Sequence, residues 1–356
     1  MSSRGQQVAT EQWRGTTDGT PWMHRALIRI LHFTPLWLIY FVMALTLPFY
    51  MLVRPRATLA IWHYFRRRQG FGVFKTFCHV WKNHFGFGQV VVDRFAAYAG
   101  KKFEIEVVGH NHYREIEASG RGFMMISSHI GNHEMAGYDL RAKARLNVLA
   151  YGGEVEEVRS GRARLLAENN IRMVPITDGI SHIFVLKEAL ENGEVVDIHG
   201  DRLFGSPKAF SCSVLGAPAD LPQGPFVLAC SVSGEPEPVN PPAPPGGTAP
   251  AASLSAVPPR RASLDRSGTA ADAASLRDNS SVAAGVLPVI AVFCVKVGYR
   301  RFKIYIERLD VIAGSDRQSL SARERAQVLA QRYADAVSGI LLRYPDQWYN
   351  FFEFWK

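Results

Sequence analysis

The sequence predicts an α/β fold in which helices flank a mixed central sheet, with a hydrophobic membrane anchor near the N-terminus. Three observations predict it: short apolar strands alternate with helical patterns, two further strands adjoin a tight turn, and one apolar run carries no charge. The chain has 356 residues, of which 47% are hydrophobic and 21% charged, so it is able to bury a full core.

The anchor is the eighteen-residue run from Leu36 to Val53, LWLIYFVMALTLPFYMLV. At roughly 1.5 Å per residue, such a helix is just long enough to cross about 30 Å of hydrocarbon. Arginines flank the run on both sides, so charge does not fix its orientation, and Pro48 weakens a straight helix. We therefore expect residues 1–70 to carry an anchor that either spans or re-enters the membrane, the alternative being a buried core helix.

Strands and helices then alternate along the main part of the chain, residues 71–356. Strands are predicted at residues 103–108, 122–127, 147–151, 172–176 and 194–198, and helices around 133–144, 154–169 and 179–192. In open α/β sheets the functional side chains gather in the loops that follow the strands.

The C-terminal third contains a break in this pattern. Residues 234–280 are rich in Pro, Ala, Ser and Gly and offer little to bury, so we expect a disordered insertion. Strand patterns resume at 287–297 and 302–309, and the Gly298-Tyr-Arg-Arg turn between them predicts an antiparallel hairpin. A last helix at 321–343 precedes an aromatic tail.

Charge and cysteine content limit the partners. The 41 Lys and Arg against 32 Asp and Glu give a net charge of +9, which favours a phosphate-bearing substrate, a nucleic acid or an anionic membrane. No basic stripe interleaved with aromatic residues forms a recognisable nucleic-acid-binding module, so a nucleic acid is not expected. The spacing of the four cysteines predicts neither disulfides nor structural zinc.

The densest polar cluster is Ser127-Ser-His-Ile-Gly-Asn-His-Glu134, directly after the predicted strand at 122–127. His129 and Glu134 would lie about 140° apart on one continuous helix, so direct pairing requires His129 to precede the helix. Gly131 makes such a turn feasible. Glu134 at a helix start is stabilised in its ionised form by the helix dipole. The spacing therefore predicts His129 as a base that Glu134 orients.

Three other interpretations of this cluster are weaker. A zinc site would follow the order H-E-x-x-H, which this segment does not, and no second cluster completes a ligand shell, so neither a metal nor a cofactor is expected. Ser127 and Ser128 lack the G-x-S-x-G surroundings of a serine nucleophile. A polar capping turn is the third alternative. His133 is expected to serve local structure or to contact the acceptor.

The H-x-x-x-x-E motif after an apolar strand, preceded by a hydrophobic anchor, resembles the lysophospholipid acyltransferase superfamily. Within this superfamily, the segment Ser-Ser-His-Ile-Gly-Asn-x-Glu most resembles the motif of the bacterial lipid A biosynthesis late acyltransferases. Further similar stretches are Arg159-Ser-Gly-Arg162, Leu190-Glu-Asn-Gly-Glu, Gly200-Asp-Arg202, Leu215-Gly-Ala-Pro and Tyr344-Pro-Asp-Gln-Trp. The insertion and residues 81–95 depart from that branch, so a sister group that acylates other lipids or pigments is equally compatible.

The resemblance implies a membrane-associated acyltransferase whose domain is residues 71–356. It implies transfer of a fatty acyl chain from an acyl carrier protein or coenzyme A thioester to a hydroxyl or amine of a lipid acceptor. That acceptor would be lipid A or a related glycolipid or lysolipid. The implied location is the bacterial inner (cytoplasmic) membrane, with the active site facing the cytoplasm. The alternative is a catalytically inactive lipid-binding protein on the same fold.

The same chemistry suggests substrate-binding residues. Backbone N–H groups around Gly131 and Asn132, or an arginine, are candidates to stabilise the oxyanion. Arg159 and Arg162 fit phosphate recognition, with a solvated helix face as the alternative interpretation. Asp201 and Arg202 follow the predicted strand at 194–198, and we expect Asp201 to order the pocket.

Overall fold

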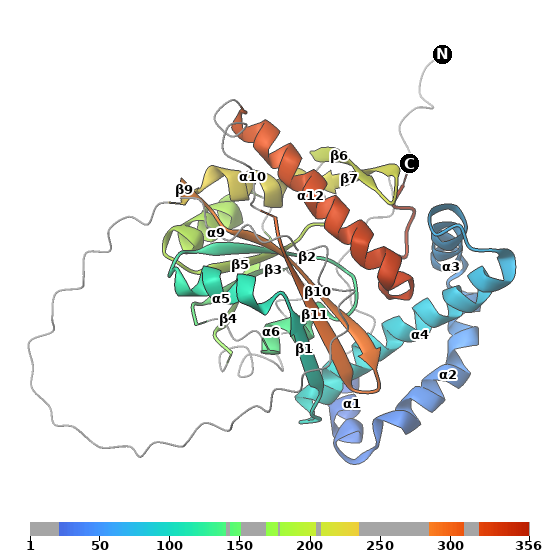
Figure 1. The fold of residues 1–356 in the computed structure, drawn as a ribbon. Helices are drawn as coiled ribbons and strands as arrows, with labels where there is room; N and C mark the ends of the chain where they lie inside the picture. The colour runs from blue at the N-terminus through green and yellow to red at the C-terminus, as the bar shows by residue number, and fades with distance from the viewer. Residues whose placement is uncertain are drawn as a thin grey trace, which may run out of the picture.

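A computed structural model describes residues 21–139, 143–150, 169–176, 179–203, 208–234, 285–309 and 320–355. The fold is α/β, with a mixed seven-stranded central sheet flanked by helices (Figure 1). The predicted fold class is confirmed at that level. The predicted helix around 154–169 and the predicted insertion at 234–280 lie outside the described residues, apart from one end residue of each.

The central sheet has the strand order β1-β11-β10-β2-β5-β3-β4. Its strands are β1 (Glu104–Val108), β2 (Phe123–Ser127), β3 (Leu146–Ala150), β4 (Ile171–Pro175), β5 (Val195–His199), β10 (Val289–Gly298) and β11 (Arg301–Arg308). All seven coincide with predicted strands, with small shifts at the ends. The predicted hairpin is confirmed, since β10 and β11 pair antiparallel while β10, β2, β5, β3 and β4 run parallel.

The middle of the sheet is apolar on both faces. Every residue of β2 is buried, and so are the first four of β5. Strands of this kind are typical of parallel sheets that helices cover on both sides. The register aligns Ser127 with His199, so β2 and β5 end side by side at one edge.

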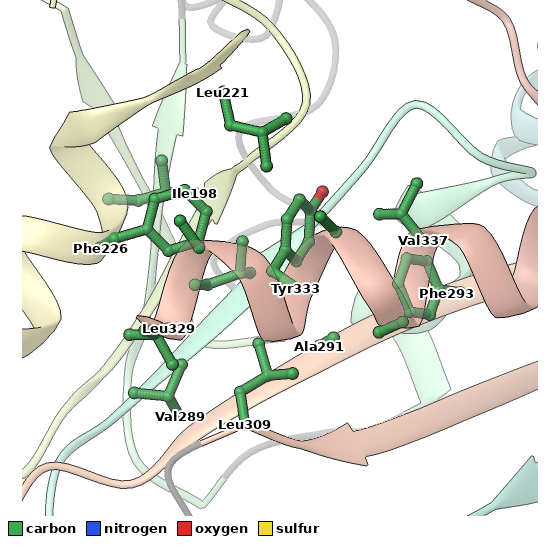
Figure 2. Packing of buried hydrophobic residues seen from close by; sticks show 14 of the residues in the cluster. Ile198, Leu221, Phe226, Val289, Ala291, Phe293, Leu309, Leu329, Tyr333 and Val337 are labelled. Atoms are coloured by element: carbon green, nitrogen blue, oxygen red, sulfur yellow. The ribbon is translucent and has the colours of Figure 1, made fainter. Parts of the chain in front are cut away.

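The long helix α12 (Ala322–Arg343) covers one face of the sheet. Ser321 and Glu324 cap its start reciprocally, as a capping box does. Figure 2 shows Leu329, Tyr333 and Val337 of this helix in the core with β10, β5 and α10 (Gln223–Ser231). Burying each such side chain contributes on the order of 1.5–3 kcal/mol. The predicted last helix is thereby confirmed.

Shorter helices complete the covering of the sheet. They are α5 (His110–Ala118), α6 (His133–Asp139) and α9 (Ser181–Glu191). The helices predicted around 133–144 and 179–192 correspond to α6 and α9.

The N-terminal part is helical. It consists of α1 (Pro21–Phe33), α2 (Leu36–Val53), α3 (Pro55–His63), the π-helical turn η1 (Tyr64–Arg68) and α4 (Val73–Tyr98). Helices α1 and α2 pack on α4 through a small apolar cluster that includes Leu31, Tyr40 and Phe95. Within the described part of the chain, α2 alone is long and apolar enough to cross a membrane. Only 17% of it is buried, which does not fit a core helix.

A two-stranded hairpin of β6 (Ala209–Val214) and β7 (Ala217–Pro222) was not predicted. A second small pair joins β8 (Ser233–Gly234) to β9 (Gly285–Val286). After α12, the short helix η2 (Pro345–Gln347) leads into an aromatic tail that turns back toward the sheet edge.

Candidate active site

The candidate site lies where β2 and β5 end. Because parallel strands end at the same edge of a sheet, the loop after Ser127 and the loop after His199 meet there. The first loop carries His129 and the second carries Asp201, which are 72 positions apart in the chain.

The Asp201 carboxylate holds His129 from two directions. Its Oδ1 lies 2.8 Å from Nδ1 of the imidazole, and its Oδ2 accepts the backbone N–H of His129 at 3.0 Å. The indole Nε1–H of Trp348 donates to the same Oδ2 at 3.2 Å. Asp201 is only 1% exposed, so these N–H donors stand in for the water that burial removes.

The charge states of the pair follow from these contacts. Burial by itself would raise the pKa of Asp201, but the charge and hydrogen bond of His129 and the charge of Arg202 lower it overall. Burial is the largest influence on His129, and the pKa of its imidazole is lowered. An ionised Asp201 that accepts from Nδ1 leaves the lone pair of a neutral His129 on Nε2. This is the arrangement that a general base requires.

Glu134 has other partners. Its Oε1 accepts from Arg94 Nη1 at 3.0 Å and its Oε2 from the Tyr98 hydroxyl at 2.5 Å, both on α4. His129 does precede the helix, as predicted, since α6 begins at His133. The predicted pairing is nevertheless corrected, because Asp201 holds the position at Nδ1 that the spacing assigned to Glu134.

Gly131 and Asn132 build the loop. Gly131 adopts a φ of +65°, and a Cβ there would lie 2.0 Å from the carbonyl oxygen of Cys294. Its N–H donates to Gln347 O at 2.7 Å, and the N–H of Asn132 donates to Cys294 O at 2.7 Å. These amides are therefore engaged within the protein, which corrects their predicted role as oxyanion donors.

Gly200 lets α12 approach the site. A Cβ on Gly200 would lie 2.6 Å from Cγ2 of Ile126 and 2.9 Å from the Tyr333 ring. The Tyr333 hydroxyl donates to Ser127 O at 2.8 Å, which links α12 to the end of β2. This close packing fixes the backbone from which Asp201 extends.

Arg202 holds the aromatic tail. Its Nε donates to Asn350 Oδ1 and its Nη2 to Tyr349 O, both at 2.8 Å. The N–H of Tyr349 in turn donates to His129 O at 3.0 Å. Through these contacts Arg202 braces the loop that carries His129, whereas the sequence predicted a substrate-binding residue.

Two further histidines flank His129. The His199 ring centroid lies 4.5 Å from that of His129 and 4.4 Å from that of His133. Burial lowers the pKa of His133 to about 4 and that of His199 well below its usual range, so both are neutral at pH 7. Within the described ranges, no group of three or more His, Cys, Asp or Glu side chains is arranged to hold a metal ion.

The two serines before His129 make structural contacts. Ser127 Oγ donates to Asp197 Oδ1 at 2.8 Å, and burial raises the pKa of that carboxyl to about 6. Ser128 Oγ accepts the N–H of Ile130 at 3.3 Å. Both hydroxyl groups therefore have a structural role in the loop.

Sequence patterns alone did not identify Trp348, Tyr333, Arg94 and Tyr98 as parts of this site. Trp348 belongs to the Tyr344-Pro-Asp-Gln-Trp stretch that resembles the acyltransferase branch, and this resemblance was the signal that could have identified it. Arg159 and Arg162 lie outside the described residues. Asp201 contacts His129, and its predicted role in ordering a substrate pocket stays a prediction.

The chain was compared with models of known protein families and with curated proteins, and neither comparison finds a match. The function is therefore inferred from the chemistry of the site and from the motif resemblance.

Proposed function

We propose that the protein is a membrane-associated acyltransferase that moves a fatty acyl chain from a thioester to a hydroxyl or amine of a lipid acceptor. The observation that carries the proposal is the buried His129–Asp201 pair, with 2.8 Å between Nδ1 and Oδ1, at the ends of two parallel strands. The H-x-x-x-x-E resemblance supplies the reaction class. In this proposal the fold is of the glycerolipid acyltransferase type.

In the proposed reaction, His129 Nε2 accepts the proton of the acceptor hydroxyl as its oxygen attacks the thioester carbonyl. Asp201 keeps Nδ1 protonated and stabilises the imidazolium that forms. The carbon–sulfur bond then breaks, and the imidazolium returns the proton to the leaving thiolate. The donor already carries an activated acyl group, so neither a covalent enzyme intermediate nor a cofactor is required.

The proposed donors are acyl carrier protein and coenzyme A thioesters. Their phosphate groups are compatible with the net charge of +9. The proposed acceptor is lipid A or a related glycolipid or lysolipid.

The apolar surface of the N-terminal helices supports a membrane location. Exposed large apolar side chains gather on α1 and α2, among them Trp22, Phe33, Trp37, Phe41 and Phe49. Tryptophans such as Trp22 and Trp37 are enriched at membrane–water interfaces, and the phenylalanines add apolar surface. We place the protein at the bacterial cytoplasmic membrane, with the site facing the cytoplasm.

The test is an acyl-transfer assay on the full chain in detergent. It uses radiolabelled acyl carrier protein or coenzyme A thioesters and a panel of lipid A precursors and lysolipids, with products identified by mass spectrometry. We expect His129→Ala to lower turnover by roughly 10²–10⁴-fold, the usual contribution of a general base. The half-buried His112 on α5 gives the matched control, His112→Ala, which keeps activity.

Near-full turnover by the His129→Ala variant would overturn the proposed role of this residue. If the wild-type chain binds the lipids but transfers no acyl group from either donor, the inactive lipid-binding alternative is correct.

A further inference from the structure

A small cavity lies next to the catalytic pair, between α3–η1 and the aromatic tail. Its volume is about 60 Å³, which is room for more than one water-sized group and too little for an acyl chain. Its aromatic walls include Tyr64, Trp348, Phe354 and Trp355. The cavity is formed by segments far apart in the sequence, and one of its walls belongs to the site already described.

Asn350 lies in the wall of this cavity. The side chain lines the cavity and is only 3% exposed. Its Oδ1 accepts from Arg202 Nε at 2.8 Å, and this partner fixes which end of the amide is the oxygen. Nδ2 is then buried with no hydrogen-bond partner among the described residues. Because Nδ2 itself is buried, Asn350 supplies part of the cavity wall and a link to Arg202, and the donors for a ligand come from the arginine side chains of the lining.

Two guanidinium groups line the same cavity. Arg68 stacks on the Trp355 ring, with its central carbon 5.1 Å from the ring centroid. Stacking uses the face of the guanidinium group and leaves its N–H edge available. Arg67 is exposed at the rim, and no hydrogen bond of either arginine is found within the described part of the chain.

The charge balance at the cavity favours an anion. Glu353 is the acidic residue in the lining, and its Oε1 lies 2.5 Å from His63 Nδ1. Two guanidinium groups therefore remain as donors. Paired guanidinium N–H groups match the oxygens of a phosphate.

We propose that this cavity binds the phosphate group of an organic ligand between Arg67 and Arg68, with the aromatic walls contacting the carbon atoms next to the phosphate. The ligand would be either a lipid headgroup or the phosphate-bearing arm of the acyl donor.

The site is coupled to the catalytic pair by two contacts. The Trp348 ring lines the cavity while its Nε1–H donates to Asp201, and Asn350 is bonded to Arg202. A bound phosphate would therefore hold the residues that position His129. Phosphate binding itself requires no acyl transfer, so it is measurable even if the proposed function is wrong.

The experiment measures binding of inorganic phosphate to the full chain in detergent by isothermal titration calorimetry. We expect saturable binding to the wild-type protein. Arg67→Gln removes one exposed cation and is expected to weaken binding roughly tenfold, as loss of one charge-assisted hydrogen bond does. Asn350→Asp is nearly isosteric, keeps an acceptor for Arg202 and places a negative charge in the wall, so binding should be lost.

Arg66 provides the matched control. It is the neighbouring arginine on η1, but its guanidinium group donates to Phe71 O and does not line the cavity. Arg66→Gln should bind phosphate as the wild type does. Unfolding curves check that each variant is folded, and if Asn350→Asp is not, Arg67→Gln and Arg66→Gln still decide the question.

Competition then identifies the source of the phosphate. Displacement by 4′-phosphopantetheine supports the donor arm, and displacement by vesicles that contain phosphatidic acid supports a lipid headgroup. The proposal is overturned if inorganic phosphate shows no saturable binding to the wild type. It is equally overturned if Arg67→Gln and Asn350→Asp bind it as the wild type does.

Discussion

Asp201 and Asp93 are both buried carboxylates, exposed by 1% and 0%, and their pKa values shift in opposite directions. Asp201 accepts three N–H groups, from the backbone and side chain of His129 and from Trp348, and its pKa is lowered. Asp93 on α4 is bonded to the Lys296 ammonium and the Tyr40 hydroxyl. Burial raises its pKa more than Lys296 lowers it.

The difference shows what keeps a buried carboxylate ionised. One counter-ion does not fully offset the loss of water around Asp93. Several preorganised donors do so around Asp201, whose carboxylate is therefore ionised at pH 7. Asp93 instead joins α2, α4 and β10, because its partners Tyr40 and Lys296 come from the other two elements.

The largest effect is expected for Asp201→Asn. An asparagine has one acceptor oxygen where three N–H donors converge, so the imidazole tautomer is no longer enforced. Turnover should fall by roughly 10³–10⁴-fold, as in hydrolases that lose the corresponding carboxylate. The exposed Asp335 on α12 gives the control Asp335→Asn, which should leave the acyl-transfer rate unchanged. A loss of less than tenfold for Asp201→Asn would show that Asp201, like Asp93, has a structural role and does not orient His129.

The next effect concerns Lys296→Met, which leaves Asp93 buried without its cation. Breaking a buried pair in this way should lower the free energy of unfolding by about 3–5 kcal/mol, measured by denaturant titration. Lys303→Met is the matched control, since Lys303 pairs at 3.0 Å with Glu106, whose side chain is 61% exposed, and pairs open to solvent contribute about 1 kcal/mol or less. Equal losses in the two variants would refute the structural role of the Asp93 cluster.

Glu134→Gln should have a smaller effect on rate than Asp201→Asn. It removes the charge that faces Arg94 and Tyr98 while leaving the hydrogen bond at His129 Nδ1 intact. Loss of one charge-assisted hydrogen bond corresponds to a rate decrease of roughly 10–100-fold if all of it appears in the transition state. A loss as large as that of Asp201→Asn would restore Glu134 as the orienting carboxylate.

The smallest effect is on the pH profile of kcat/KM. In the proposed reaction neutral His129 is the active form, and its pKa is lowered by burial, so activity should persist at pH 6.5 and decline only in more acidic buffer. The negative charge of Asp201 raises the pKa of His129, so the residual activity of Asp201→Asn should decline at still lower pH. An acidic limb above pH 6.5 in the wild type would contradict the neutral imidazole.

The strands of the central sheet were predictable because their apolar runs are long enough to show burial on both faces. The β6–β7 hairpin was missed although its signal is present. Phe210, Cys212 and Val214 alternate with exposed residues, and Leu215-Gly216 form a two-residue turn with positive φ at both positions. The serines and alanines in β6 and β7 weaken the alternation of apolar and polar residues, so the two strands were not recognised.

The site was only partly predictable. The position of His129 before a helix follows from local spacing, and the structure has it there. The choice between Asp201 and Glu134 depends on which strand lies next to β2, and strand order is a property of the whole sheet. The donors Trp348 and Tyr98 come from a tail and a helix whose packing local patterns do not encode.

The most direct test of the account is the tautomer of His129, observed by ¹⁵N NMR on histidine-labelled full chain in detergent and assigned with His129→Ala. We predict a neutral ring protonated at Nδ1, preserved in Glu134→Gln and lost in Asp201→Asn. A tautomer that is lost in Glu134→Gln and preserved in Asp201→Asn would contradict the central claim that Asp201 orients the base.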